Sequence, residues 1–167
     1  MIKNIVTLFT ISILLLSCKS SSTISKNDEG IIKGEFSRSV LETDEKFSWF
    51  KSQYSTYQPD ENAIHFLDST ARNYRFLVFL GTWCGDSKNG VPKFCKIADV
   101  SHISQENIIL YGLDRTKKSD DGLTEKYHIT NVPTVIVLMN DNEIGRITEH
   151  PQESFEKDLV RIINYNR

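Results

Sequence analysis

The sequence predicts one α/β domain, with a central mixed β-sheet flanked by helices and an N-terminal helical extension. Two short apolar runs, residues 76–80 and 108–113, have the length and composition of buried strands. A segment with helical periodicity joins them, which is the pattern of parallel strands linked by a crossover helix. A third apolar run, 134–139, leads through a tight turn into a strand over 143–148 and predicts an antiparallel edge pair.

Length and composition are those of an ordinary globular protein. The 167 residues are enough for one hydrophobic core but not comfortably for two domains. Hydrophobic residues make up 39% of the chain and charged residues 25%, which are usual values. The formal net charge of −2 argues against a nucleic-acid-binding protein, because such proteins usually carry a basic excess.

The N-terminal segment predicts export and attachment to a membrane. Lys3 is followed by an apolar run over 5–16, shorter than the roughly 20 residues that a membrane-spanning helix needs. We assign residues 1–17 to a signal peptide. Residues 15–18, Leu-Leu-Ser-Cys, resemble the lipobox of bacterial lipoproteins. This resemblance implies a lipid on Cys18 and a protein held on a membrane of the bacterial cell envelope, facing the periplasm. The alternative is an ordinary secretory signal with an incidental cysteine.

The remaining chain divides into a tether and a folded domain. Small polar residues follow Cys18 and bury too little apolar area to become ordered. We therefore predict a flexible tether over 18–33 and a domain over 34–167. Within that domain we expect a helical extension over 34–74 and a core over 75–167.

Two helices are predicted in the extension. The first covers 40–57, and the second begins at Pro59, a residue suited to the first turn of a helix. Each has apolar residues three to four apart on one face. These are Phe47, Phe50, Tyr54 and Tyr57 in the first helix, and Ala63, Ile64, Leu67 and Ala71 in the second.

The core contains three further helices between and after its strands. One runs from the turn at 81–84 to about Ala98, and Pro92 is expected to kink it. A short helix is expected near 121–127, and the last helix over 152–165. The buried faces of the first and last helices are Val91, Phe94, Cys95 and Ala98, and Phe155, Leu159, Ile162 and Ile163.

Cys84 stands where the strand over 76–80 passes into a helix. Unpaired backbone N–H groups and the positive end of the helix dipole point at such a position. Both favour a thiolate, which is the nucleophile in thiol–disulfide exchange. Asp86 opposes this, because a nearby carboxylate disfavours a second negative charge. We expect a thiolate fraction that is raised but not extreme.

Residues 83–88, Trp-Cys-Gly-Asp-Ser-Lys, resemble the Trp-Cys-x-x-Cys-Lys active-site segment of the thioredoxin superfamily. Residues 131–134, Asn-Val-Pro-Thr, are similar to the loop that carries the family's cis-proline. The resemblance covers about 75–165 and implies a thioredoxin-like fold. It also implies that Cys84 is the catalytic residue and that a substrate strand lies against a set of neighbouring residues. That set is Trp83 (as a lid flanking the cysteine), Gly85, Asp86, Val132 and Pro133.

Two positions depart from the family pattern. Ser87 stands where the family has its second, resolving cysteine, and Val78 stands where thioredoxins have a buried carboxylate. A serine hydroxyl cannot clear a mixed disulfide, and we expect it only to hydrogen-bond the Cys84 sulfur. Any activity is therefore expected to be of a monothiol type. This favours isomerisation, or exchange with small-thiol adducts, over net reduction.

Cys95 is not expected to replace the missing thiol. At 1.5 Å rise per residue it lies about 16 Å from Cys84 along the helix, whereas the Cα atoms of a disulfide approach within roughly 7 Å. Its position in the apolar stripe favours core packing. The histidines, His65, His102, His128 and His150, have no metal-ligand spacing, and we expect neither a metal nor a cofactor.

The leading hypothesis is a cell-envelope thiol–disulfide oxidoreductase or isomerase of monothiol type, acting on protein thiols and disulfides or on small-thiol adducts through Cys84 and Ser87. A different class is a non-catalytic module whose groove binds an extended peptide, with Cys84 incidental. A third alternative follows monothiol glutaredoxins, whose Cys-Gly-x-Ser cysteine helps to hold an iron–sulfur cluster. Trp83 and the export signal argue against that third alternative.

Overall fold

A computed structural model describes residues 25–27 and 29–166. The predicted signal peptide and Cys18 lie outside these residues. The described chain forms a six-stranded mixed sheet in the order β1-β2-β4-β3-β5-β6. The strands are β1 (Ser25–Lys26), β2 (Ile32–Phe36), β3 (Tyr74–Leu80), β4 (Ile108–Gly112), β5 (Thr134–Met139) and β6 (Asn142–Thr148).

The pairing confirms the predicted architecture. Strands β3 and β4 are parallel, and β5 and β6 form the antiparallel pair at the edge. The central strand β3 also pairs antiparallel with β5, and β2 pairs antiparallel with β4. The sheet is therefore mixed.

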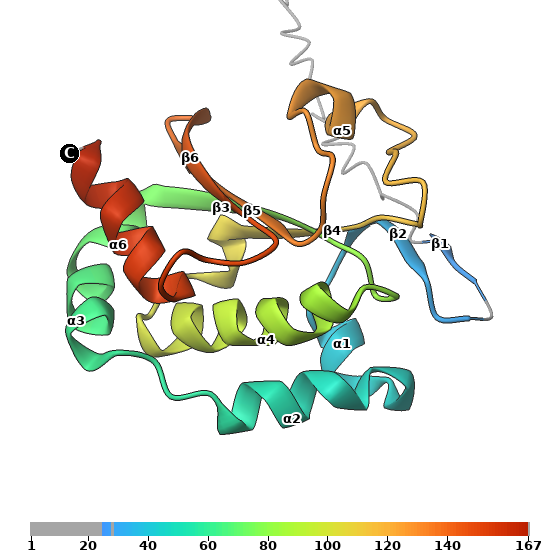
Figure 1. The fold of residues 1–167 in the computed structure, drawn as a ribbon, viewed down its shortest axis with the longest axis horizontal. Coiled ribbons are helices and arrows are strands. Elements are labelled where there is room, and N and C mark those ends of the chain that lie inside the picture. The colour runs from blue at the N-terminus through green and yellow to red at the C-terminus, as the bar shows by residue number, and fades with distance from the viewer. Residues whose placement is uncertain (1–24, 28, 167) are drawn as a thin grey trace, which may run out of the picture.

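The helices lie mainly on one side of the sheet. Figure 1 shows α1, α2, α3 and α4 below the sheet, α6 at its left end and the short α5 above it. Helix α6 packs into the same part of the core as α4. Their bounds are α1 (Ser39–Thr43), α2 (Ser48–Thr56), α3 (Glu61–Thr70), α4 (Gly85–Val100), α5 (Leu123–Lys126) and α6 (Phe155–Tyr165), with 3-10 turns η1 (Glu45–Phe47), η2 (Ala71–Asn73) and η3 (Gln105–Asn107). In the part of the chain that the structure describes, no helix has the length and apolar character needed to cross a bilayer.

The prediction of a flexible tether over 18–33 is wrong for the part of this segment that the structure describes. Residues 25–26 and 32–36 pair as two antiparallel strands, and β2 continues the sheet beside β4. Ile32 is fully buried and Phe36 nearly so, because their alternate side chains enter the core while the intervening residues face outward. This β1–β2 hairpin also means that the extension over 34–74 begins with a strand.

The predicted helix over 40–57 is broken into α1, η1 and α2. The break lies at Asp44, which has an extended backbone, and its carboxylate accepts a hydrogen bond from the Lys46 N–H. An aspartate that caps the following turn favours a new helical start over continuation. In the second helix, Asp60 is the N-cap and Pro59 precedes it. The remaining elements lie within a few residues of their predicted bounds.

The core has one part on each face of the sheet. Strand β3 alternates between them, because Phe76, Val78 and Leu80 face the helices while Leu77 and Phe79 face α5. These β3 residues are at most 4% exposed, which confirms the prediction of a strand buried on both faces. The smaller part, around Phe79, also packs against Trp83 and Cys84, so it supports the residues predicted to be functional.

A polar network fixes the extension to α4. The Arg38 guanidinium donates two hydrogen bonds to the Asp99 carboxylate, at 2.8 and 2.7 Å, and the Tyr54 hydroxyl donates a third at 2.7 Å. Burial disfavours the charged carboxylate, but these hydrogen bonds outweigh it and hold the pKa of Asp99 below its ordinary value. The network links the N-terminal helices to the helix that begins at Cys84.

Candidate active site

Cys84 is the N-cap residue of α4. Its N–H donates to the Gly81 carbonyl at 2.9 Å, and its carbonyl accepts from the Lys88 N–H at 3.0 Å. The first closes the turn after β3 and the second begins the helix. The side chain is partly exposed, at the carboxyl ends of the parallel strands β3 and β4, where ligand chemistry in α/β sheets is usually located.

The loop before β5 lies against the Cys84 sulfur. The Val132–Pro133 peptide bond is cis, as the family resemblance implies. The Cys84 thiol donates to the Val132 carbonyl at 3.3 Å. Thr134 steadies the loop, because its hydroxyl donates to the Asn131 carbonyl at 2.8 Å. The structure therefore brings together Cys84, Val132 and Pro133 from segments about 50 residues apart in sequence.

Ser87 is fully buried, and its hydroxyl accepts a hydrogen bond from the Gly81 N–H at 3.1 Å. This differs from the expectation that the hydroxyl bonds the Cys84 sulfur, a contact not found in the described structure. Because Gly81 starts the turn that ends at Cys84, Ser87 holds the backbone of the active-site turn. Val78, the other position that departs from the family pattern, is also fully buried.

Trp83 is held in place as one wall of the site. Its indole N–H donates to the Leu113 carbonyl at 2.8 Å. The ring folds back over Gly81 so closely that a Cβ there would lie 2.7 Å from it. The guanidinium of Arg115 covers the ring at 5.1 Å from the centroid. These contacts hold the Trp83 side chain against the loop after β4 and the turn at Gly81, and its role as a lid over the cysteine stays a prediction.

Gly85 and Asp86 form the first turn of α4 beside Cys84. Gly85 is exposed, and Asp86 lies 3.7 Å from His150. Asp86 also lines a cavity of about 280 Å³ to which Tyr57, at the end of α2, contributes. The N-terminal extension thus shapes a surface next to the active-site helix in addition to packing on it.

Thr82 belongs to the turn that carries Cys84, and the sequence did not predict this role. It is 5% exposed, and its hydroxyl donates to the Gly30 carbonyl at 2.8 Å and accepts from the Ile32 N–H at 3.3 Å. The β1–β2 hairpin therefore supports the turn that carries Cys84. Gly112 permits this approach, because a Cβ there would lie 2.5 Å from the Ile32 carbonyl oxygen. No local pattern marks Thr82, since its partners are about 50 residues away.

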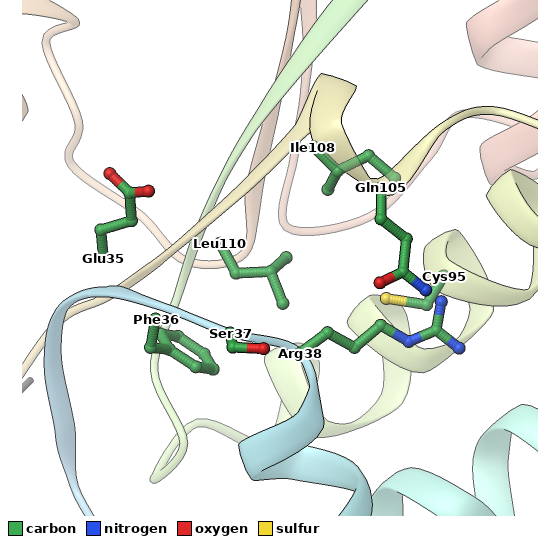
Figure 2. Close-up of a pocket in the computed structure, with 8 residues that line it drawn as sticks. All are labelled: Glu35, Phe36, Ser37, Arg38, Cys95, Gln105, Ile108 and Leu110. Carbon is green, nitrogen blue, oxygen red and sulfur yellow. The ribbon is translucent and has the colours of Figure 1, made fainter. Parts of the chain in front are cut away.

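Cys95 lies in the core, 1% exposed, as the apolar stripe predicts. Burial raises the pKa of its thiol to about 12, so it remains protonated at neutral pH. Figure 2 shows Cys95 and Arg38 at one end of a cavity of about 320 Å³ between β2, β4 and α4, with Phe36 and Leu110 among its apolar lining. Burial and protonation both disfavour a role for this thiol as a second redox group.

The histidines lie on the surface. His102 contacts Asp68, and His150 contacts Asp86. Among the residues that the structure describes, no three His, Cys, Asp or Glu side chains gather into a set that could hold a metal ion.

Comparisons with known proteins agree with a thioredoxin-like fold. Residues 35–160 match the thioredoxin family. A thioredoxin from Echinococcus granulosus is 35% identical over 83 residues, which cover 48% of this chain and 72% of that protein. A protein disulfide isomerase-like 2-2 from Oryza sativa subsp. japonica is 29% identical over 131 residues, which cover 78% of this chain and 33% of that protein. The chain thus spans only about a third of the isomerase.

A solved structure shares the fold. A crystal structure of a protein of unknown function from Pseudomonas aeruginosa superposes with a TM-score of 0.51 at 21% identity, covering 79% of this chain and 81% of that one. At this identity the likeness concerns the fold alone. The match over most of the described residues carries the assignment: the chain belongs to the thioredoxin family, whose members include thiol–disulfide oxidoreductases.

Proposed function

We propose that this protein performs thiol–disulfide exchange in the cell envelope through a single thiol, Cys84. The observation that carries the proposal is the contact of the Cys84 sulfur with the Val132 carbonyl, 3.3 Å away, at the N-terminus of α4. Free backbone N–H groups at a helix N-terminus stabilise a thiolate. Cys84 is partly exposed beside the buried Val132 and Pro133, so a disulfide can approach it from solvent.

The reaction proceeds by two exchanges. The Cys84 thiolate attacks one sulfur of a substrate disulfide, a bond forms between them, and the other sulfur leaves as a thiolate that takes up a proton. A second thiolate then attacks the substrate sulfur of this mixed disulfide and releases Cys84. If that thiolate belongs to the substrate, the result is an isomerised disulfide with no net reduction. If it comes from an external thiol, the substrate sulfur passes to that thiol in a new mixed disulfide. A second external thiol must then attack the external sulfur of this bond, which releases the reduced substrate and joins the two external thiols in a disulfide.

Neither Ser87 nor Cys95 can perform this second step, so the attacking thiol must come from another molecule. Ser87 carries no thiol, and its hydroxyl is engaged with the Gly81 N–H. Cys95 is buried and protonated. A mixed disulfide on Cys84 therefore has no resolving thiol within the described chain, and it is expected to persist until a substrate or external thiol arrives.

Trapping of mixed disulfides tests this proposal. Cells are treated with an alkylating agent to fix thiols, and the protein is isolated on a non-reducing gel and examined by mass spectrometry. We expect adducts joined to Cys84 that disappear in Cys84→Ala. The matched control is Cys95→Ala, which removes the buried thiol and is expected to keep the adducts. An unmodified Cys84 under both normal and oxidising growth would instead favour the non-catalytic peptide-binding module.

The envelope location rests on the N-terminal sequence. An apolar run over 5–16 ending in Leu-Leu-Ser before Cys18 supports a lipid anchor, and we include this anchor in the proposal. Replacing Cys18 with serine is expected to release the protein from the membrane fraction, because it removes the lipidated sulfur. Retention of the Cys18→Ser protein in that fraction, measured by immunoblotting, would contradict the anchor.

A further inference from the structure

The loop after β4 has a defined shape beside the active site. The Asp114 carboxylate accepts hydrogen bonds from the N–H and the hydroxyl of Thr116, and the Asp114 carbonyl accepts from the Lys117 N–H at 3.0 Å. Lys33 provides a further partner for the carboxylate, at 3.5 Å. This turn fixes the backbone of Arg115. The carboxylate of Asp114, the residue before Arg115, already has these partners.

Arg115 is unusual among the described arginines. Its guanidinium covers the Trp83 ring, and Trp83 directly precedes Cys84. No carboxylate among the described residues forms an ion pair with it, whereas every other described arginine has one. Those paired arginines are Arg38, Arg72, Arg75, Arg146 and Arg161. The unpaired guanidinium is exposed and lies over the side chain of the residue that precedes the nucleophile.

Lys117 places a second cation at the other boundary of the site. Its ammonium group donates to the Thr130 carbonyl at 2.8 Å and to the Asn131 side-chain oxygen at 3.3 Å. Both acceptors are neutral and directly precede Val132. The carboxylate of Glu149 lies beyond Asn131, whose amide donates to it at 3.2 Å. Lys117 is therefore held against the loop that contacts Cys84, without forming an ion pair among the described residues.

Charges of both signs surround Cys84. Arg115 and Lys117 lie on the loop after β4, and Asp86 and Lys88 lie in the first turn of α4. Glu149 follows β6, and the Asn131 side chain lies between its carboxylate and the Lys117 ammonium group. A guanidinium that lies over an indole ring and forms no ion pair has N–H groups available, and these match the two oxygens of a carboxylate. The stacking also reduces the conformational entropy that the side chain loses on binding.

We infer that Arg115, assisted by Lys117, binds a carboxylate carried next to the disulfide that Cys84 attacks. The preferred substrates are disulfides with an acidic group close to one sulfur. The carboxylate belongs to an acidic residue beside a protein cysteine or to a small thiol in an adduct. This inference rests on the proposed thiol exchange and leaves its steps unchanged. Arg115 exchanges no proton or electron and determines specificity by binding.

The test compares two matched peptides with the purified full-length protein. Each peptide contains one cysteine in a disulfide with a chromogenic thiol, and the residue beside the cysteine is Asp in one and Asn in the other. The rate of release of the chromogenic thiol by Cys84 is measured for both. We expect wild type to prefer the Asp peptide by about tenfold at low ionic strength, and to lose much of this preference in high salt.

Substitutions of arginine test whether Arg115 causes the preference for the Asp peptide. Arg115→Gln is expected to reduce the Asp/Asn ratio to about one, and Arg115→Lys to give an intermediate ratio. The ratio is taken within each variant, so that a change common to both peptides cancels. The control is Arg72→Gln, which removes an exposed arginine elsewhere on the surface and is expected to keep the wild-type ratio. An equal ratio in wild type and Arg115→Gln would overturn the inference.

A second pair of probes separates the two sources of the carboxylate. Glutathione disulfide and its esterified form differ only in their carboxylates, and the rate at which each forms an adduct on Cys84 is followed by mass spectrometry. A preference for the free acid that depends on Arg115 supports the inference and identifies small-thiol adducts as substrates. A preference confined to the Asp peptide supports it and identifies protein disulfides. If Cys84 reacts with none of the probes, the proposed function fails; equal reaction with both members of each pair overturns only the carboxylate inference.

Discussion

Replacing Ser87 with cysteine is expected to shorten the lifetime of mixed disulfides on Cys84 by a factor on the order of 10², because a thiol in the same molecule acts at a high effective concentration. Positions three apart on a helix have Cβ atoms about 5–6 Å apart, slightly more than the roughly 3.5–4.5 Å of a disulfide, so a small local adjustment would close the bond. Ser87 lies in the first turn of α4, three residues after Cys84. The measurement is the decay of a purified mixed disulfide, with reduction of insulin as a second assay.

A matched variant separates the new thiol from the lost hydroxyl. Ser87→Ala removes the hydrogen bond from the Gly81 N–H without adding a thiol, and it is expected to leave the adducts as long-lived as in wild type. Adducts of equal lifetime in wild type and Ser87→Cys would contradict the monothiol interpretation. The apolar Val78 supplies no proton-transfer group, so the gain in net reduction is expected to stay below that of a dithiol thioredoxin.

Replacing Ile32 with alanine is expected to lower the free energy of unfolding by about 2–5 kcal/mol, the usual effect for a buried aliphatic side chain. Total stabilities of domains are about 5–15 kcal/mol, so this is a large effect. Ile32 is 0% exposed in β2 and its backbone approaches Gly112. Urea denaturation followed by tryptophan fluorescence measures it.

The neighbouring residue provides the control for Ile32. Ile31 precedes the strand and is only half-buried. Ile31→Ala is therefore expected to lower the free energy of unfolding by clearly less than Ile32→Ala. A loss below about 1 kcal/mol in Ile32→Ala would be the behaviour of a flexible tether. That result would contradict the packing of β2 against the sheet.

The elements that the sequence predicted well are those with strong local patterns. The run over β3 is apolar throughout because both of its faces are buried, and α4 and α6 have apolar residues at helical spacing. The position of Cys84 at a helix start follows from the same patterns. Strand β2 was missed because it is short and contains Gly34, and because its pairing with β4 joins residues far apart in sequence.

The details of the site depend on distant partners and could not be predicted. The role of Ser87 depends on which group comes within hydrogen-bonding distance, and the structure brings the Gly81 N–H there. Thr82 acquires its role only when Gly30 and Ile32 return beside it. Arg115 belongs to no motif, and its contact with Trp83 follows from the turn after β4.

The hydrogen bonds of Thr82 have a practical consequence for choosing where to cut this protein. The family match begins at residue 35 and ends at 160, and a fragment trimmed to those limits would lose Gly30 and Ile32 and half of α6. The Thr82 hydroxyl would then lose both partners, and the surface beside Gly112 would be uncovered. Inactivity of such a fragment would reflect a damaged active-site turn and not the chemistry of Cys84. Expression from residue 19 onward keeps the hairpin and gives a fair assay.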